Sequence, residues 1–303
     1  MALLAHWQKA FSLLVLVGPW VLGLLGWQWP APALVWLALA LGLGQPAVLG
    51  LEFLIMGRVN RSAGLPVPSA KRRWRAWALE CLWAWWVFGW CQPWRSQQEP
   101  DLLVPGGGRR GVLLLHGYFC NRGFWQPWLR RLRAQGRPFM ALSLAPVFGS
   151  IDEYGPHIEE AVQRLTRLTG RAPVVLAHSM GGLAVRAWWR QRGDDSALCH
   201  VVTLGSPHRG TWLARFARSR NGRQMRLDGA WLQALARSEP AARRARFSCV
   251  HSDCDNIVFP ASTALLAGAT DWRVEGVAHV ALAFDAGVQR RVLALLEALD
   301  AEG

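Results

Sequence analysis

Residues 174–182 read Val-Val-Leu-Ala-His-Ser-Met-Gly-Gly, and this stretch decides the fold. An apolar run leads into a turn of small residues and then into a helical pattern, which predicts a strand, a tight turn and a helix. The turn fits the G-x-S-x-G pattern of a nucleophile elbow, with Ala177 in place of the first glycine. The strand and helix nearly touch in such a turn. The sequence therefore predicts that Ser179 stands out at the end of a strand.

On both sides of this turn, short apolar runs alternate with longer helical patterns. The predicted strands are residues 111–115, 138–144, 173–177, 200–204, 247–251 and 272–277. The predicted helices are 123–135, 153–168 and 181–192, and segment 279–299 is predicted to end in a helix. Apolar strands that alternate with helices indicate an α/β fold, a mostly parallel sheet with helices on both faces. Ligands of such sheets bind beyond the carboxyl ends of the strands.

A serine hydroxyl needs a base from another loop at the same sheet edge. His279 directly follows the last predicted strand, which is the expected place. His116 precedes the serine, whereas the order in this pattern is serine, acid, histidine, so we expect it to brace the oxyanion loop. His178 should point away from the serine, and His208 follows the wrong strand.

Two acids follow the strand 247–251, namely Asp253 and Asp255. Asp255 is preferred because the segment Asp-Asn-Ile-Val-Phe-Pro that it opens turns the chain back into the domain, whereas Asp253 fits a turn. The acid holds the histidine tautomer and stabilises the imidazolium. The predicted triad is therefore Ser179, Asp255 and His279.

The backbone supplies the predicted oxyanion hole. The N–H of Met180 follows the nucleophile, and the N–H of Tyr118 follows the His116-Gly117 turn at the end of the first strand of the domain. Each such donor is typically worth roughly 3 kcal/mol of transition-state stabilisation.

Together these residues resemble the small bacterial lipases and esterases of the α/β-hydrolase superfamily. The likeness rests on Ala-His-Ser-Met-Gly-Gly at 177–182, on Thr-Leu-Gly-Ser-Pro-His-Arg-Gly-Thr at 203–211, and on the pairing of segments 255–258 and 276–280. It extends from about residue 110 to the end of the chain. It implies the α/β-hydrolase fold, Ser179, Asp255 and His279 as the triad, and Tyr118 and Met180 as oxyanion donors.

Segment 211–246 departs from this likeness. It is rich in arginine, where a lipase lid would show a clear apolar face. The candidates for such a face are Leu213, Phe216, Trp231, Leu232 and Leu235.

The N-terminal part of the chain predicts membrane attachment. Residues 10–51 carry no charge, and the apolar runs 11–27 and 33–56 each approach the roughly 20 residues that a spanning helix needs. We predict a transmembrane hairpin over residues 1–57, with a break between its two helices at residues 28–32. A cleaved signal peptide is the alternative, but the second run is as apolar as the first, so an anchor would remain.

Residues 58–108 connect this hairpin to the catalytic domain, which is predicted at 109–303. A basic loop comes first, then the Trp-rich segment 77–90, then a linker with prolines and glycines at 92–108. Five tryptophans and Glu80 favour an interfacial helix over a span. An interfacial helix would leave the domain in the cytoplasm at a bacterial inner membrane, and a span would place it in the periplasm; the cytoplasmic side is favoured.

The formal net charge of +14 comes mainly from arginine. Nucleic acid is not expected as a partner, because neither zinc-finger spacing nor an RNA-binding aromatic signature occurs. Two explanations of the positive charge are left open. It could attract the protein to anionic lipids, or it could reflect a GC-rich genome that encodes arginine where another would encode lysine. The six cysteines are scattered and form no C-x-x-C pair, so a metal site is not expected. The sequence does not imply an organic cofactor either. A bridge between Cys249 and Cys254 is left open.

These features predict a carboxylic-ester hydrolase that acts on lipids or other apolar acyl substrates. An acyltransferase would use the same triad with an alcohol or amine as acceptor. A membrane-tethered binding protein on the same fold is the third reading, since a fold does not prove activity.

Overall fold

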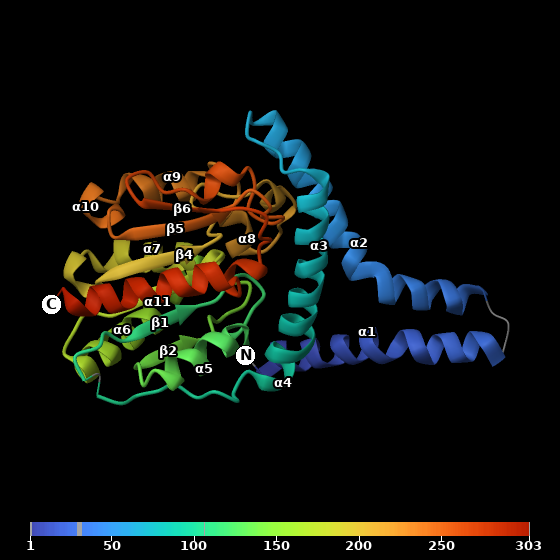
Figure 1. Ribbon diagram of the computed structural model, residues 1–303, viewed down its shortest axis with the longest axis horizontal. Helices are drawn as coiled ribbons and strands as arrows, with labels where there is room; N and C mark the ends of the chain where they lie inside the picture. Colours follow the sequence, from blue (N-terminus) through green and yellow to red (C-terminus); the bar gives the residue numbers. More distant parts are fainter. Residues whose placement is uncertain (1, 29–31, 106, 303) are drawn as a thin grey trace.

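The computed structural model describes residues 2–28, 32–105 and 107–302. A layered domain carries N-terminal helices along one side (Figure 1). Helix α1 (Ala2–Gln28) and the first part of α2 (Pro32–Ser62) extend away from the domain, whereas the second part of α2 packs on it and α3 (Ala70–Ala84) stands against it. The break predicted between the two apolar runs falls mostly on residues 29–31, outside the described residues.

The domain is built on a six-stranded sheet in the order β2-β1-β3-β4-β5-β6, and every pairing is parallel. The strands are β1 (Val112–Leu115), β2 (Phe139–Leu142), β3 (Val174–His178), β4 (His200–Leu204), β5 (Phe247–Ser252) and β6 (Thr270–Val274). The longer helices of the domain are α5 (Gln126–Ala134), α6 (Gly155–Thr169), α7 (Met180–Arg192), α9 (Ala230–Arg237) and α11 (Ala286–Ala301). The shorter helical segments are η2 (Arg122–Trp125), η3 (Ile151–Tyr154), η4 (Asp195–Ala197), η5 (Trp212–Phe216), α8 (Arg220–Gln224), α10 (Ala241–Arg244), η6 (Ala261–Ala264) and η7 (Ala281–Ala283). The predicted α/β fold is confirmed.

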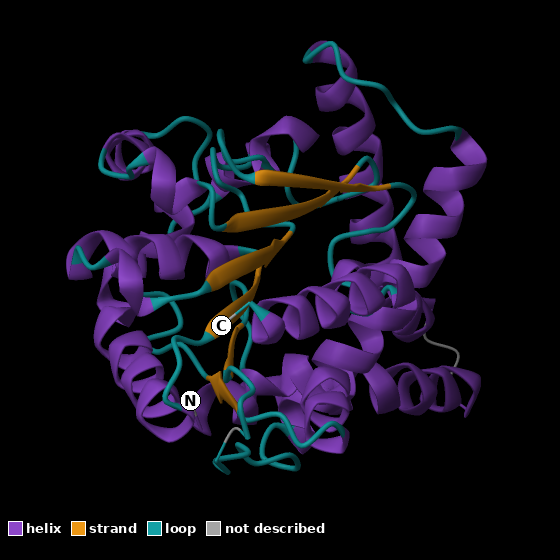
Figure 2. Ribbon diagram, turned by 60° about the vertical axis from the view of Figure 1, so that its left-hand side comes forward, coloured by secondary structure: helices purple, strands orange, loops and turns teal. Residues whose placement is uncertain are grey.

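Helices cover both faces of the sheet (Figure 2). Alternate strand residues point to opposite faces. Leu113 and Val175 therefore pack with α6 and α7, while Leu114 and Leu176 pack with α5 and α11. Strands buried on both faces are apolar at nearly every position, which explains the runs seen in the sequence.

Near the C-terminus the structure confirms one predicted helix and corrects one predicted strand boundary. The helix predicted at the end of segment 279–299 begins at Ala286, because the Asp285 side chain accepts the N–H of Val288 and caps it there. The strand expected to reach residue 277 ends at Val274, and Gly276 then turns the chain with a φ of 72°. A loop with one 3-10 turn therefore carries His279.

The Trp-rich segment lies against the domain along one face. It belongs to α3 and to the π-helical η1 (Trp85–Cys91), which continues into α4 (Gln92–Arg95). Glu80 and Val87 are buried, and the ring of Trp83 stacks on Phe284 with centroids 4.6 Å apart. Trp74, Leu82 and Trp90 remain exposed on the other side. The interfacial location of this segment stays a prediction.

Among the described residues, one helical segment, His6–Leu25, is long and apolar enough to cross a membrane. The second predicted run lies in α2, which contains Pro46. Among its described residues, α2 does not meet the length and hydropathy requirement for a membrane span. The predicted linker is ordered at Leu102, which forms an antiparallel bridge with Phe139 of β2. The hairpin and the domain boundaries stay predictions.

A buried ion pair ties α7 to the chain after α9. Arg186 donates to both carboxylate oxygens of Glu239, at 2.8 and 2.6 Å, and to the carbonyl of His208 at 3.0 Å. Both paired side chains are almost completely buried. Arg186→Ala leaves a buried, unpaired carboxylate, so we expect a loss of about 3–5 kcal/mol in the free energy of unfolding. Denaturant unfolding of the purified protein measures it.

Arg209→Ala provides the matched control. Arg209 also donates twice to a carboxylate, that of Asp228, but both side chains are more than half exposed. The loss there should stay below about 1 kcal/mol. Equal losses in the two variants would contradict the importance of burial.

Candidate active site

Ser179 occupies the turn between β3 and α7 in a strained conformation. Its φ is 53° and its ψ is −126°, a region that non-glycine residues rarely adopt and that is typical of functional sites. Its N–H donates to the carbonyl of Leu204 at 2.9 Å, which fixes the turn to β4. The sequence motif thus forms the strand, turn and helix that it predicts.

The small residues of the motif allow two backbones to meet. A Cβ on Gly181 would collide with the carbonyl oxygen of Leu115 at the end of β1. Ala177 is completely buried on the sheet face that packs against α6 and α7. A larger residue at either position would push the nucleophile turn away from the sheet.

His279 and Asp255 form a buried pair. His279 Nδ1 lies 3.0 Å from Asp255 Oδ2, and Asp255 Oδ1 accepts the N–H groups of Ile257 and Val258 at 2.9 and 2.7 Å. A carboxylate can only accept, so Nδ1 carries the proton and Nε2 is left as a base. Burial by itself lowers the pKa of His279, but the charge and hydrogen bond of Asp255, together with other nearby carboxylates, outweigh burial and raise it.

The end of β4 joins this pair to the serine. Leu204 holds the backbone of Ser179, and a Cβ on the next residue, Gly205, would lie 2.8 Å from Asp255 Oδ2 and 3.1 Å from His279 Nδ1. The ring of His178 lies 4.6 Å from that of His279. The three predicted residues therefore lie at the carboxyl edge of the sheet, on the loops after β3, β5 and β6, and His279 contacts Asp255 directly.

The predicted oxyanion donors lie beside the serine. A Cβ on Gly117 would be 2.8 Å from Ser179 Cβ, so the loop that leads to Tyr118 passes directly over the nucleophile. Met180 is the first residue of α7, and the first N–H groups of a helix have no intrahelical acceptor. The Tyr118 hydroxyl lies 3.1 Å from Ser219 Oγ, and the oxyanion role of the Tyr118 and Met180 N–H groups stays a prediction.

His116 braces the loop that follows β1. Its Nε2 accepts the N–H of Leu144 at 2.9 Å, which leaves Nδ1 to donate to the carbonyl of Gly117 at 2.9 Å. Burial lowers the pKa of His116 to about 4, so the ring is neutral near pH 7. It therefore serves as a fixed donor and acceptor rather than as a base.

The rejected alternatives are occupied elsewhere. Asp253 accepts the N–H of Gly276 at 2.7 Å and pairs with Arg72 at 3.0 Å. His208 Nε2 lies 3.0 Å from Thr203 Oγ1 inside the domain. His178 Nε2 donates to the carbonyl of His279 at 3.0 Å, so this ring supports the base loop.

The cysteines carry no bridge or metal site in the part of the chain that the structure describes. Cys249 and Cys254 are free thiols that lie in different apolar clusters. No group of histidine, cysteine and acidic side chains that could hold a metal ion is found among the described residues.

The arginine-rich segment is folded onto the domain. Leu232 and Leu235, two candidates for a lid face, are buried against the core that includes α7. Phe216 is exposed, and Trp212 stacks on Phe259 of the acid loop with centroids 6.1 Å apart. The apolar residues of the segment are therefore divided between the core and the rim of the site.

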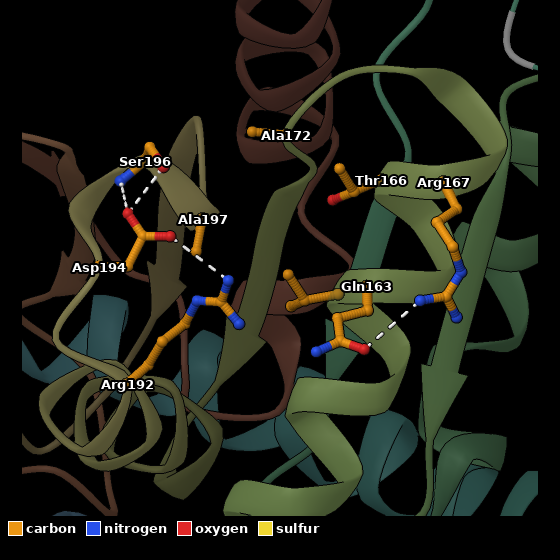
Figure 3. A pocket seen from close by; sticks show the side chains of 9 residues that line it. Gln163, Thr166, Arg167, Ala172, Arg192, Asp194, Ser196 and Ala197 are labelled. Atoms are coloured by element: carbon orange, nitrogen blue, oxygen red, sulfur yellow. Dashed lines mark hydrogen bonds and ion pairs between the residues drawn. The ribbon is translucent and has the colours of Figure 1, made fainter.

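A surface cavity lies away from this site. It is lined by the end of α6, by Arg192 and by the residues before β3 and β4, and Figure 3 shows the Arg192–Asp194 ion pair there. Residues before parallel strands lie at the amino edge of the sheet, opposite Ser179. This cavity therefore has no part in the proposed chemistry.

The sequence pattern of a known family covers the whole sheet. The pattern of the Alpha/beta hydrolase family matches residues 112–300. The chain belongs to the alpha/beta hydrolase family. No curated protein matches the sequence.

Solved structures show this alpha/beta hydrolase fold. The mature form of the Bacillus licheniformis lipase BlEst2 is 14% identical, with a TM-score of 0.56, and the match covers 63% of this chain and 94% of that one. Its propeptide form is 15% identical with a TM-score of 0.55, over 65% and 52% of the two chains. At these identities the likeness shows the fold alone.

Sequence reasoning missed three polar residues near His279. Glu80 of α3 and Glu52 of α2 reach the loops that carry His279 and Asp255, and Asn256 follows Asp255. One signal was available in the sequence: each of two apolar helical runs contains a single acid. Burying a charged side chain is costly unless it has a partner. Both glutamates lie outside the residues matched to the alpha/beta hydrolase family.

Proposed function

We propose that this protein is a membrane-anchored serine hydrolase that cleaves carboxylic esters of lipids or other apolar acyl substrates through an acyl-enzyme. The observation that carries the proposal is the buried Asp255–His279 pair, placed beside a strained serine at the same sheet edge. A nucleophile, its base and an orienting acid on separate loops are the arrangement that acyl transfer requires.

The chemistry runs in two balanced steps. Ser179 Oγ attacks the carbonyl carbon while His279 Nε2 takes its proton, and the N–H groups of Tyr118 and Met180 hold the oxyanion. The ester C–O bond breaks, and the alcohol leaves with the proton from His279. Water, deprotonated by His279, then attacks the acyl-enzyme, and the acid is released as Ser179 regains its proton.

An aromatic rim supports an apolar acyl group as substrate. Phe119 follows the oxyanion loop and stacks on Phe148 with centroids 5.9 Å apart, and both rings are more than two-fifths exposed. Phe216 packs edge-on against Trp212 at 5.4 Å. Exposed apolar patches of this kind commonly bind ligands or membranes.

The N-terminal helices are proposed to anchor the enzyme in a bacterial inner membrane. Segment His6–Leu25 is long enough to span, and Trp7, Trp20 and Leu24 are largely exposed. The net charge of +14 suits anionic lipids, and the basic residues at 58–75 favour the cytoplasmic face. Protease digestion of the domain from outside intact spheroplasts would overturn the cytoplasmic placement.

Ester hydrolysis is tested with the purified full chain and p-nitrophenyl esters of increasing acyl length. We expect hydrolysis that improves with acyl length, because each buried methylene adds about 0.8 kcal/mol of binding. A fluorophosphonate probe should modify Ser179 and stop the reaction, as peptide mass spectrometry would show. Modification of Ser179 without hydrolysis of any ester would refute the proposal, and acceleration by an added alcohol would indicate an acyltransferase.

A further inference from the structure

Glu80 of α3 holds the turn that follows His279. Its Oε1 accepts the N–H of Val280 at 2.8 Å, and its Oε2 accepts the N–H of Ala281 at 3.0 Å. These N–H groups begin the 3-10 turn η7, where a negative charge is favourable. Glu80 is only 1% exposed, so both oxygens are committed to the base loop.

Glu52 of α2 reaches the same loop through one intermediate residue. Its Oε2 accepts Asn256 Nδ2 at 2.7 Å, and Asn256 Oδ1 accepts the N–H of His279 at 3.3 Å. Asn256 is completely buried and directly follows Asp255. Glu52 therefore fixes the orientation of an amide that joins the acid loop to the base loop.

Packing places these contacts in a shared core. Phe53 and Met56 of α2 and Ala76 of α3 form one apolar cluster with Phe259 and Ala281 from the catalytic loops. An ion pair between Arg72 and Asp253 adds a second connection between α3 and the acid loop. The N-terminal helices are thus docked on the two loops that carry Asp255 and His279.

The Glu80 carboxylate is costly in this core. Burial raises its pKa to about 7, although the N–H groups of Val280 and Ala281 favour the ionised form. An apolar side chain of similar size would avoid this cost. Buried acids with raised pKa values gather at functional sites, and here the neighbour is a catalytic base.

We propose that Glu80 and Glu52 are positioning residues for His279, which orient the base loop and supply negative charge beside the imidazole. This inference rests on the proposed function, in which His279 is the base. Since both residues come from the N-terminal helices, those helices do more than attach the enzyme to a membrane. They complete the support of its active site.

Charge and orientation have different kinetic effects. The ionisable groups that face His279 are Asp255 after β5, Glu80 on α3, Glu52 on α2 and His178 at the end of β3. Removing a glutamate charge lowers the pKa of His279, so the acid limb of the rate profile moves to lower pH. Lost packing alone would lower the rate without moving the limb.

The test measures the rate constant with which a fluorophosphonate probe modifies Ser179 in the full chain, from about pH 5 to about pH 9, where a histidine base titrates. Glu52→Gln keeps an acceptor for Asn256 and removes only the charge, whereas Glu80→Gln also loses one of two acceptors. We expect the acid limb to move to lower pH in both. The plateau of Glu80→Gln should also fall by roughly 10²-fold, as for a displaced catalytic group.

Asp285→Asn is the matched control, because this acid caps α11 in the same loop through Val288 without touching the base. Its profile should follow that of the unmodified protein. Unchanged limbs in both glutamine variants would overturn the inference while leaving ester hydrolysis intact. If Glu80→Gln does not fold, Glu52→Gln decides alone. If the probe reacts but no ester is cleaved, the proposed function fails and the limb shift still decides the inference.

Discussion

Ser179→Ala should lower kcat/KM for p-nitrophenyl esters by roughly 10⁶-fold, because removing a triad nucleophile leaves only binding and oxyanion stabilisation. The loss should come from kcat, since the change removes the attacking atom and leaves the aromatic rim intact. Steady-state hydrolysis by the purified protein measures it, together with the thermal unfolding midpoint. The midpoint should not fall, because the hydrogen bond that holds the turn comes from the backbone N–H of residue 179, and alanine keeps it.

Ser206→Ala is the control for this variant. Ser206 is also buried, and its hydroxyl has no partner among the described residues. It lies beside Gly182, the third residue after the nucleophile, outside the proposed chemistry. We expect it to retain most of the activity. A Ser179→Ala protein that still hydrolysed esters at a comparable rate would show that another group is the nucleophile.

Asp255→Asn should lower kcat by about 10⁴-fold, as in triads where the acid becomes an amide. The geometry explains why. Oδ1 of residue 255 accepts two N–H groups, from Ile257 and Val258, so an asparagine would keep its oxygen there and turn its NH₂ toward His279. His279 Nδ1 would then have to accept, the proton would move to Nε2, and the base would be blocked.

Asp253→Asn distinguishes the two acids of this loop. Asp253 binds Arg72 and the N–H of Gly276 and does not contact His279, so its amide should cost less than about 10-fold in kcat. We compare the two variants by measuring kcat for each under the same conditions, and circular dichroism checks that both are folded. A large loss in Asp253→Asn with near-normal Asp255→Asn would reverse the assignment of the acid.

The sequence alone predicted the features that depend on local patterns. Apolar runs at 112–115, 174–178 and 200–204 alternate with helical patterns, and only a parallel sheet covered on both faces satisfies that alternation. The nucleophile turn was readable because a strand cannot meet a helix so closely unless small residues such as Gly181 stand there. Chain order then indicated Asp255 and His279.

The end of the last strand shows where local patterns failed. Val277 could continue a strand, and the mostly apolar residues 279–284 could begin a helix. Gly276 and the Asp285 cap stop both. Single residues of this kind decide where a strand or helix ends, which the apolar periodicity does not show.

Only the tertiary structure shows which segments the N-terminal helices contact. Composition made residues 1–57 an anchor and residues 77–90 an interfacial helix, because hydropathy records how much apolar surface a segment carries but not what covers it. Glu52 and Glu80 lie 28 positions apart in the sequence. Their hydrogen-bond partners, Asn256 and Val280, lie in loops some 200 residues further along the chain. Hydrogen bonds between such distant segments depend on how the chain packs, which no local pattern specifies.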